Sequence, residues 1–398
     1  MRKKKDEEEI FSPEDWLDVT IASAVQTRAS DIHIEPLRDR LLVRFRIDGV
    51  LKVIGELPQA HAEHIIARLK VLGKLNSAEH RLPQEGHAVV ELPTEKATNI
   101  DVRISLFPTL YGETAVMRIL NRADEVHEDF ADLGMSEGHI QIMNDVMGMP
   151  FGMVLATGPT GSGKTTLLYT ALSMLEQPER NVVTLEDPVE RQFEYIRQSQ
   201  INPAVGLTYA LGLRSILRQD PDVVMIGEIR DQETAEIASR AALTGRLLFS
   251  TLHTKDTVGA ITRLLDYDIP RSIISSALRL VVNSRLMRRV CPDCAQPAAP
   301  AQTLLDEAAK IFDISNVHFV AGVGCEKCGS TGYRGRISIF EILRIDETIE
   351  QAIIDSMPVT AIRRVALDAG MQTLRADGVT KAAQGIITLE DAIHTTML

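Results

Sequence analysis

The sequence predicts an α/β fold in which a parallel sheet, buried on both faces, forms the centre of the chain. From residue 136 onward, short and continuously apolar runs alternate with helical patterns, as in sheets covered by helices on both sides. A glycine-rich loop, GPTGSGKTT, lies between one such run and a helical segment, and polar residues follow the other runs. With 398 residues, the chain is too long for one core, so two or three domains are expected.

Residues 1–11 predict a disordered tail, because the charged start MRKKKDEEE is not followed by the apolar stretch of a secretory signal. Residues 12–29 then predict a helix. Ser12 can cap its first turn, Pro13 suits the position after the cap, and Asp15 completes a capping-box pattern.

Residues 12–120 predict a small α+β domain, in which strand alternation is interrupted by helical spacing. The expected elements after the first helix are strands over 30–51 with a hairpin turn at Asp48-Gly49, a helix over about 59–76, and strands over 86–106 and 114–120. The polar and acidic segment 121–135 predicts a linker to the sheet domain.

Residues 136–290 predict the sheet domain, whose apolar runs are 153–157, 181–187, 222–229 and 246–253. In a parallel sheet the carboxyl ends of the strands meet at one edge, and ligands bind there. The polar residues that end these runs would therefore converge: the loop from Gly158 onward, Glu186, Asp187, Glu228, Ser250 and His253.

The last third of the chain predicts a helix, a cysteine module and a helical region. The spacing over 271–289 favours a helix that leads into the first cysteine pair. Residues 291–340 contain both cysteine pairs, and residues 341–398 have a helical pattern with turns expected at Gly370, Gly378 and Gly385.

The composition argues against two classes of function. The formal net charge of −12 disfavours a broad nucleic-acid-binding surface, which normally carries an excess of basic residues. No apolar run approaches the roughly 18 residues of a membrane-spanning helix, so no transmembrane segment is expected. A hydrophobic content of 44% and a charged content of 25% are ordinary for a globular protein.

The segment 158–166 has the residue types and spacing of a phosphate-binding loop, against the alternative of an ordinary glycine-rich turn. Glycines let the backbone approach a polyphosphate, whose oxygens the loop amides and the next helix N-terminus can bind. Lys164 can bridge the β- and γ-phosphates of ATP, and the Thr165 hydroxyl can ligate Mg²⁺. The predicted nucleotide-binding residues are Gly158, Pro159, Thr160, Gly161, Ser162, Gly163, Lys164, Thr165 and Thr166.

Glu228 ends the run VVMIGE, where a carboxylate could orient and deprotonate the water that attacks the γ-phosphate. A standard Walker B strand has Asp before this Glu, whereas this chain has Gly227. Mg²⁺ binding would then depend more on Thr165, water and the phosphates, with Glu186 as a candidate to assist. His253 could sense the γ-phosphate or the attacking water. A structural role is the alternative for Glu186 and His253, and a solvated acid at a strand end is the alternative for Glu228.

Positioned arginines accelerate phosphoryl transfer, because negative charge spreads over the γ-phosphate oxygens in the transition state. Arg214, Arg218 and Arg230 are the candidates in the sheet domain. Arg103 and Arg118 lie on predicted strands of the N-terminal domain, where a surface salt bridge is the alternative.

All four cysteines fall in two CxxC pairs separated by 30 residues: Cys291, Cys294, Cys325 and Cys328. Two such pairs predict tetrahedral thiolate ligation of a structural Zn²⁺, and four protein ligands close the coordination sphere against catalysis. A redox pair or unrelated buried thiols are the alternatives.

Taken in order, the motifs SDIHIEP, VRFRIDG, GPTGSGKTTLLY, TLEDPVE, LRSILRQDPDVVMIGEIRD, STLHTKDT, CPDC with CEKC, GYRGR and GMQTLRADG resemble those of the secretion and pilus-assembly ATPases. This family contains the type II secretion ATPase (general secretion pathway protein E) and the type IV pilus extension ATPase. The resemblance spans about residues 15–398 and is highly specific.

The resemblance implies a RecA-like ATPase domain after a PAS-like domain, in a homo-hexameric motor on the cytoplasmic side of the inner membrane. ATP turnover would act on platform proteins there and drive pseudopilin or pilin assembly. Lys164 and Thr165 would be the Walker A pair, Glu228 the catalytic glutamate, and Glu186, His253, Arg103 and Arg118 further site residues. Gly227 and the four zinc-ligating cysteines match the same family pattern.

Several alternatives stay open from the sequence. The motifs do not separate type II secretion from type IV pilus extension or DNA-uptake pilus assembly. A scaffold that binds ATP without turnover belongs to another class, and a nucleic-acid translocase is disfavoured by the net charge. The chain could be a monomer in solution and a hexamer on the platform. Only about a dozen residues precede the first predicted helix, so the docking route through the family's longer N-terminal domain is also open.

Overall fold

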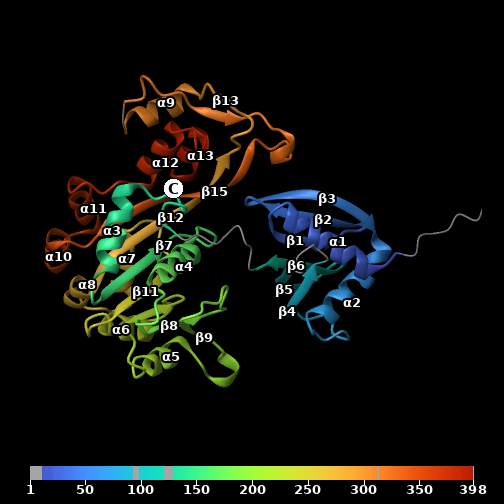
Figure 1. The fold of residues 1–398 in the computed structure, drawn as a ribbon, viewed down its shortest axis with the longest axis horizontal. Helices are drawn as coiled ribbons and strands as arrows, with labels where there is room; N and C mark the ends of the chain where they lie inside the picture. The colour runs from blue at the N-terminus through green and yellow to red at the C-terminus, as the bar shows by residue number, and fades with distance from the viewer. Residues whose placement is uncertain (1–10, 93–97, 121–128, 312, 398) are drawn as a thin grey trace, which may run out of the picture. The chain divides into compact units, whose positions relative to one another are not determined.

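The computed structural model describes residues 11–92, 98–120, 129–311 and 313–397. The chain divides into two compact units, Met1–Glu125 and Val126–Leu398, called here the N-terminal and C-terminal units (Figure 1). The expected tail lies almost wholly outside the described residues, and so does most of the expected linker.

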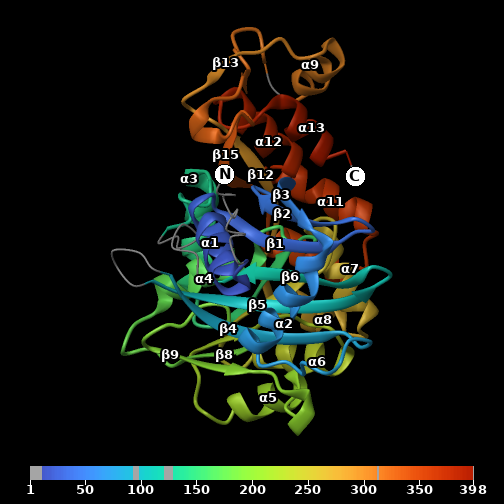
Figure 2. The ribbon, with the colours of Figure 1, turned by 90° about the vertical axis from the view of Figure 1, so that its right-hand side faces the viewer.

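The N-terminal unit is a six-stranded antiparallel sheet with two α-helices, as the alternating pattern predicted. Figure 2 shows the strands from top to bottom in the order β3, β2, β1, β6, β5, β4. Its elements are α1 (Pro13–Gln26), β1 (Ala29–Pro36), β2 (Arg40–Ile47), β3 (Val50–Pro58), η1 (Gln59–His61), α2 (Ala62–Leu72), β4 (Gln84–Leu92), β5 (Thr98–Thr109) and β6 (Gly112–Ile119).

Local sequence signals account for these elements. The Ser12 hydroxyl accepts the amide of Asp15 at 3.2 Å and caps α1. Asp48 and Gly49 both have positive φ, at 48° and 86°, as a tight hairpin turn requires. On β1, Ile32 and Ile34 are fully buried in the core that also contains residues of α1 and α2, whereas the alternate residues form a polar face.

The C-terminal unit is organised around a seven-stranded sheet in the order β15-β12-β7-β11-β10-β8-β9. All neighbours are parallel except the β12–β15 pair, which is antiparallel. The strands are β7 (Gly152–Thr157), β8 (Val182–Glu186), β9 (Ile196–Gln200), β10 (Val223–Ile226), β11 (Leu247–Leu252), β12 (Leu278–Val290) and β15 (Tyr333–Arg344).

Two apolar cores lie on opposite faces of this sheet. Met153 and Leu155 of β7 belong to one core, and Val154 and Ala156 belong to the other, as expected for a strand buried on both faces. Helix α3 (Glu137–Met147) precedes the first of these strands, and the helices between the strands are α4 (Lys164–Leu175), η3 (Pro203–Val205), α5 (Tyr209–Ile216), α6 (Gln232–Ala241), α7 (Val258–Asp266) and α8 (Arg271–Ala277).

The helix predicted over 271–289 is wrong beyond its first two turns. Helix α8 ends at Ala277, and strand β12 begins at the next residue. Strand β12 pairs with β7 on one side and with β15, about 60 residues later in the chain, on the other. These distant pairings outweigh the local helical spacing, and strand β15 was not expected either.

The remaining elements form the C-terminal end. They are β13 (Ala295–Pro297), α9 (Gln302–Ala309), β14 (Val320–Gly322), η4 (Glu326–Cys328), α10 (Glu347–Ile354), α11 (Val359–Asp368), α12 (Leu374–Ala383) and α13 (Leu389–Thr395). Figure 1 shows α9, β13, α12 and α13 in its upper part and α10 and α11 at its left. Gly370 and Gly385 end helices, as expected, but Gly378 lies within α12, facing Ala392 of α13. No helix in the described ranges is long and apolar enough to cross a bilayer.

Candidate nucleotide site and cysteine cluster

The loop from Gly158 to Gly163 connects β7 to α4 and depends on its glycines. Gly158, Gly161 and Gly163 have φ values of 135°, 76° and 90°, which side chains rarely adopt. A Cβ on Gly158 would lie 2.5 Å from the Ser162 hydroxyl and 2.7 Å from the carbonyl of Ser284. The backbone can take this path only with glycine at that position.

The start of α4 is suited to an anion. Gly163 is the N-cap and supplies no side-chain hydrogen bond, so the first amides of the helix have no side-chain cap. The ammonium of Lys164 is buried and donates to the carbonyls of Gly158 and Pro159, both at 2.9 Å. The Thr165 side chain is exposed beside it. These groups fit a triphosphate with its Mg²⁺.

Burial lowers the pKa of Lys164, while the negative charge of Glu228 opposes that change and the positive charge of Arg285 adds to it. The lysine therefore lies within electrostatic reach of both residues. The Ser162 hydroxyl is buried, and it has no hydrogen-bond partner among the described residues. An unpaired buried hydroxyl inside the loop is a further sign that the loop accommodates a polar ligand.

Three neighbouring strand ends contribute a charged cluster at the same edge of the sheet. Glu228, after β10, accepts a hydrogen bond from Arg230 and lies 3.6 Å from Nε2 of His253, after β11. Arg230 also lies 3.7 Å from the carboxylate of Asp187, after β8. The structure thus brings together Glu228, His253 and Arg230 of the predicted site with Asp187, which was expected at this edge as a strand-end residue.

Gly227 has a steric explanation. A Cβ at this position would lie 2.8 Å from the hydroxyl of Tyr209, a buried residue of α5. Burial and the charges of Asp187 and Glu228 raise the pKa of Tyr209, so its hydroxyl stays protonated next to the carboxylates. Tyr209 therefore occupies space that the side chain of a Walker B aspartate would need.

Glu186 is buried inside the protein, and both of its carboxylate oxygens accept hydrogen bonds. The Tyr169 hydroxyl donates to one oxygen, and the Thr184 hydroxyl and the Gln198 amide, at 3.0 Å, donate to the other. These contacts join β8, β9 and α4. The predicted role of Glu186 beside Mg²⁺ stays a prediction, because a ligand would have to compete with three donors.

The remaining predicted arginines lie elsewhere. Arg214 on α5 forms an ion pair with Glu233 on α6, and both side chains are exposed. Arg218, just after α5, donates a hydrogen bond to the Ser215 hydroxyl at 3.4 Å. Neither contact involves Glu228. Arg103 and Arg118 belong to the N-terminal unit, where they face each other across strands β5 and β6.

Sequence reasoning missed the part of the site that β12 provides. The Ser284 hydroxyl donates to the carbonyl of Ser162 at 2.9 Å, so β12 runs along the side of the loop. Arg285 donates a hydrogen bond to the carbonyl of Lys255 at 2.9 Å, and Lys255 lies two residues after His253 in the chain. The apolar run LVV at 280–282, with two β-branched residues, was the available signal for a strand.

The four cysteines gather at a second place in the C-terminal unit, after β12 and around η4. Their Sγ atoms all lie within 4.8 Å of one another, with close pairs at 3.7 and 3.9 Å. Tetrahedral zinc with Zn–S bonds of about 2.3 Å requires S–S separations of about 3.8 Å. The amides of Cys325 and Gly332 point at Sγ of Cys328, at 3.2 and 3.3 Å, and would stabilise a thiolate. The cluster therefore fits Zn²⁺.

We expect Cys294→Ser to release zinc and to destabilise the C-terminal end, because metal binding and folding of such a cluster are coupled. The unfolding midpoint should fall by several degrees, since each kcal/mol changes it by about 2–4 °C in domains of roughly 150–250 residues. Metal content and thermal unfolding measure both effects, with the exposed Gln302→Ala as the control. Full stability of the parent chain in excess chelator would contradict a structural metal.

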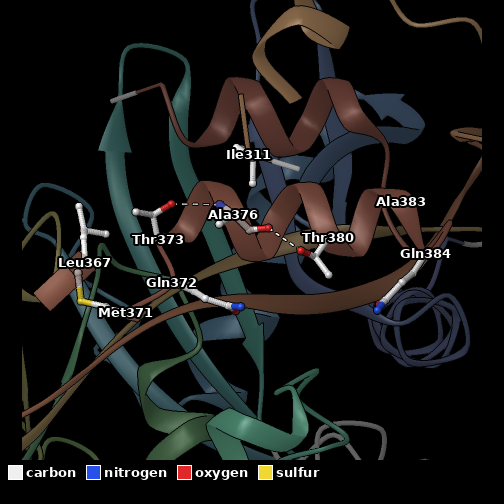
Figure 3. A pocket seen from close by; sticks show the side chains of 9 residues that line it. All are labelled: Ile311, Leu367, Met371, Gln372, Thr373, Ala376, Thr380, Ala383 and Gln384. Carbon is white, nitrogen blue, oxygen red and sulfur yellow. Dashed lines mark hydrogen bonds between the residues drawn. The ribbon is translucent and has the colours of Figure 1, made fainter. Parts of the chain in front are cut away.

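The C-terminal helices also line an open hollow of about 530 Å³, shown in Figure 3. Its wall consists of Ile311, Leu367, Met371, Gln372, Thr373, Ala376, Thr380, Ala383 and Gln384. None of the loop, strand-end or cysteine residues described above lines it. The wall has no charged side chain, so we assign the chemistry to the loop and the charged cluster instead.

A family model described as "Type II/IV secretion system protein" matches residues 5–394. The Type IV pilus assembly ATPase PilB of Thermus thermophilus is 44% identical over 404 residues, which cover 99% of this chain and 45% of the relative. The Type II secretion system protein E of Dickeya dadantii is 44% identical over 381 residues, covering 96% of this chain and 75% of the relative. The chain thus spans about half of one relative and three quarters of the other.

Two solved structures share the fold. The ATPase DotB of Legionella pneumophila superposes with a TM-score of 0.72 at 22% identity, covering 98% of this chain and 97% of the other. The pilus retraction motor PilT with bound ADP superposes with a TM-score of 0.63 at 24% identity, covering 96% and 97%. The central sheet and its glycine loop are therefore those of a RecA-like ATPase fold.

Proposed function

Because this chain belongs to the Type II/IV secretion system protein family, we propose that it hydrolyses ATP to power pseudopilus assembly in type II secretion. Its C-terminal unit is the P-loop ATPase domain. The observation that carries the proposal is the convergence of the Gly158–Gly163 loop, Lys164 and the Glu228 cluster at one edge of a parallel sheet.

In this proposal each residue acts on one group of the substrate. The loop amides and the Lys164 ammonium bind the phosphate oxygens, and Thr165 would supply a hydroxyl ligand to Mg²⁺, which neutralises phosphate charge. Glu228 accepts a proton from water as that water attacks the γ-phosphorus. The bond from the γ-phosphorus to the β–γ bridging oxygen breaks, and ADP and phosphate leave. His253 and Arg230 hold the Glu228 carboxylate from two sides.

We further propose that Arg103 and Arg118 donate to the γ-phosphate from the N-terminal unit of an assembled ring. The two arginines are register partners on β5 and β6, and their side chains are 44% and 62% exposed, so both are accessible to a ligand although each also pairs with a carboxylate of its own unit. The relatives' names indicate secretion and pilus machines. We therefore propose a homo-hexamer that acts on membrane platform proteins at the cytoplasmic face, carries Zn²⁺ in the cysteine cluster, and binds no nucleic acid.

Arg118→Ala should lower ATP turnover about 100-fold and change nucleotide affinity much less, because the arginine acts on charge that develops in the transition state. Steady-state turnover and equilibrium nucleotide binding separate the two effects. Arg44→Ala removes an arginine from the same sheet face, where Arg44 pairs with Glu35, and serves as the matched control. A loss of affinity without a loss of turnover would instead make Arg118 a binding contact.

Type IV pilus extension is the second candidate, because the PilB relative is as similar as the type II relative, at 44% identity. Complementation tests the choice. Restored protein secretion in a strain without its type II secretion ATPase supports the first function. Restored pili in a strain without its pilus assembly ATPase, with no rescue of secretion, supports the second.

A further inference from the structure

Arg118 is anchored by a buried carboxylate. Its Nε donates to Oδ1 of Asp31 at 2.9 Å, across the register pair of β1 and β6. Asp31 is only 4% exposed, whereas the Arg118 side chain is 62% exposed. In the part of the chain that the structure describes, Nε is the only nitrogen of this guanidinium with a protein acceptor. The two terminal nitrogens therefore stay available for a ligand.

Asp31 is itself held in place from the other side. Its second oxygen accepts the Ser30 hydroxyl at 2.8 Å and lies 3.7 Å from Nε of Arg46 on β2. The Ser30 hydroxyl also reaches the carbonyl of Arg46 at 3.3 Å. A carboxylate with both oxygens engaged in a paired strand has little freedom to rotate, so it fixes the direction of the bond to Arg118.

The neighbouring pairs lack this arrangement. Arg103, directly opposite Arg118 on β5, is bound through a terminal nitrogen to Glu85, and the two side chains are 44% and 60% exposed. Arg44 is likewise bound through a terminal nitrogen, to Glu35 at 2.6 Å. Terminal contacts use the nitrogens that would bind a phosphate. Of these three arginines, only Arg118 is bound through Nε to a buried carboxylate, which leaves both of its terminal nitrogens unused by the described residues of the protein.

We propose that Asp31 is a positioning residue that aims the guanidinium of Arg118 at the γ-phosphate. This inference depends on the function proposed above for Arg118. Loss of the Asp31 carboxylate leaves the arginine in place but lets it rotate, and misplacement of a catalytic group by about 1 Å can cost up to 100-fold in rate. The effect should appear in kcat and leave the KM for ATP unchanged, because the contact forms with transition-state charge.

Asp31→Asn tests the proposal in the full chain. It keeps the shape of the side chain but removes the charge, and we expect kcat to fall about tenfold with an unchanged KM. Glu35→Gln is the matched control, since Glu35 lies on the same strand and face and pairs with an arginine outside the proposed site. Its kcat should equal that of the parent. The double variant Asp31→Asn/Arg118→Ala should be as slow as Arg118→Ala alone, because Asp31 acts only through Arg118.

The possible results are distinguishable. If Arg118→Ala keeps parental turnover, the proposed role of Arg118 fails. If Arg118→Ala is slow but Asp31→Asn is not, only the positioning role of Asp31 is overturned. A further loss when Asp31→Asn is added to Arg118→Ala shows a structural role and also overturns it. Should Asp31→Asn unfold, Asp31→Glu keeps the charge but moves it by one methylene. A lowered kcat with this variant supports the proposal, and parental kcat refutes it.

Discussion

Glu228→Gln is expected to lower ATP turnover by at least about 100-fold while ATP still binds, since general-base catalysis contributes about 10²–10⁴-fold. Glutamine preserves the size of the side chain and can still contact Arg230 and His253, which lie on either side of the carboxylate. It cannot accept the proton of the attacking water. This variant should therefore lose ATP turnover while its affinity for ATP stays close to that of the parent.

Two measurements establish the result: steady-state phosphate release and the dissociation constant of ATP. Glu236→Gln is the matched control, because Glu236 pairs with Arg240 on the exposed surface of α6 and belongs to no strand end. Near-parental phosphate release from Glu228→Gln would refute the assignment of the base. Absence of phosphate release from the parent chain would instead favour the non-hydrolysing scaffold.

The second large effect concerns Lys164→Ala, which should abolish detectable turnover and weaken ATP binding at least tenfold. The substitution removes the ammonium that would face the β- and γ-phosphates. It also removes the two hydrogen bonds to the carbonyls of Gly158 and Pro159 that brace the loop. Both losses act in the same direction, because the loop would lose its charge and part of its shape together.

ATP consumption and thermal unfolding together check this prediction, with Lys310→Ala as the control. Lys310 has the same charge but pairs with Glu307 on the surface beside α9. A Lys164→Ala protein that consumes ATP as fast as the parent would rule out the loop as the site of hydrolysis. A Lys310→Ala protein should match the parent in both assays.

The parts of the site that could be predicted are those that short, continuous stretches of sequence determine. The glycines of the loop determine a backbone path within six residues, Glu228 lies two residues after an apolar strand, and His253 lies directly after another. Asp187 was noted as a strand-end residue, but its contact with Arg230 depends on neighbouring strands. Local pattern thus located the edge of the sheet and most of the charged residues along it.

The parts that were missed depend on pairing between distant segments. Strand β12 was predicted as a helix because its partners β7 and β15 are far away in the sequence. Because this strand was missed, its residues Ser284 and Arg285 were not predicted as part of the site. Asp31 and Arg118 are 87 positions apart, and only the register of β1 against β6 brings them together. Likewise, the three donors to Glu186 come from α4, β8 and β9.

Strand β12 has a mechanical consequence for the whole C-terminal unit. It touches the glycine loop at Ser284, and seven residues later the chain reaches Cys291 of the cysteine cluster. That length of extended strand spans about 23 Å at 3.3 Å per residue. Strand β15 pairs with it through most of this length, with a register shift between Arg288 and Val290. One paired stretch of β12 therefore connects the glycine loop to the cysteine cluster and couples the position of one to that of the other.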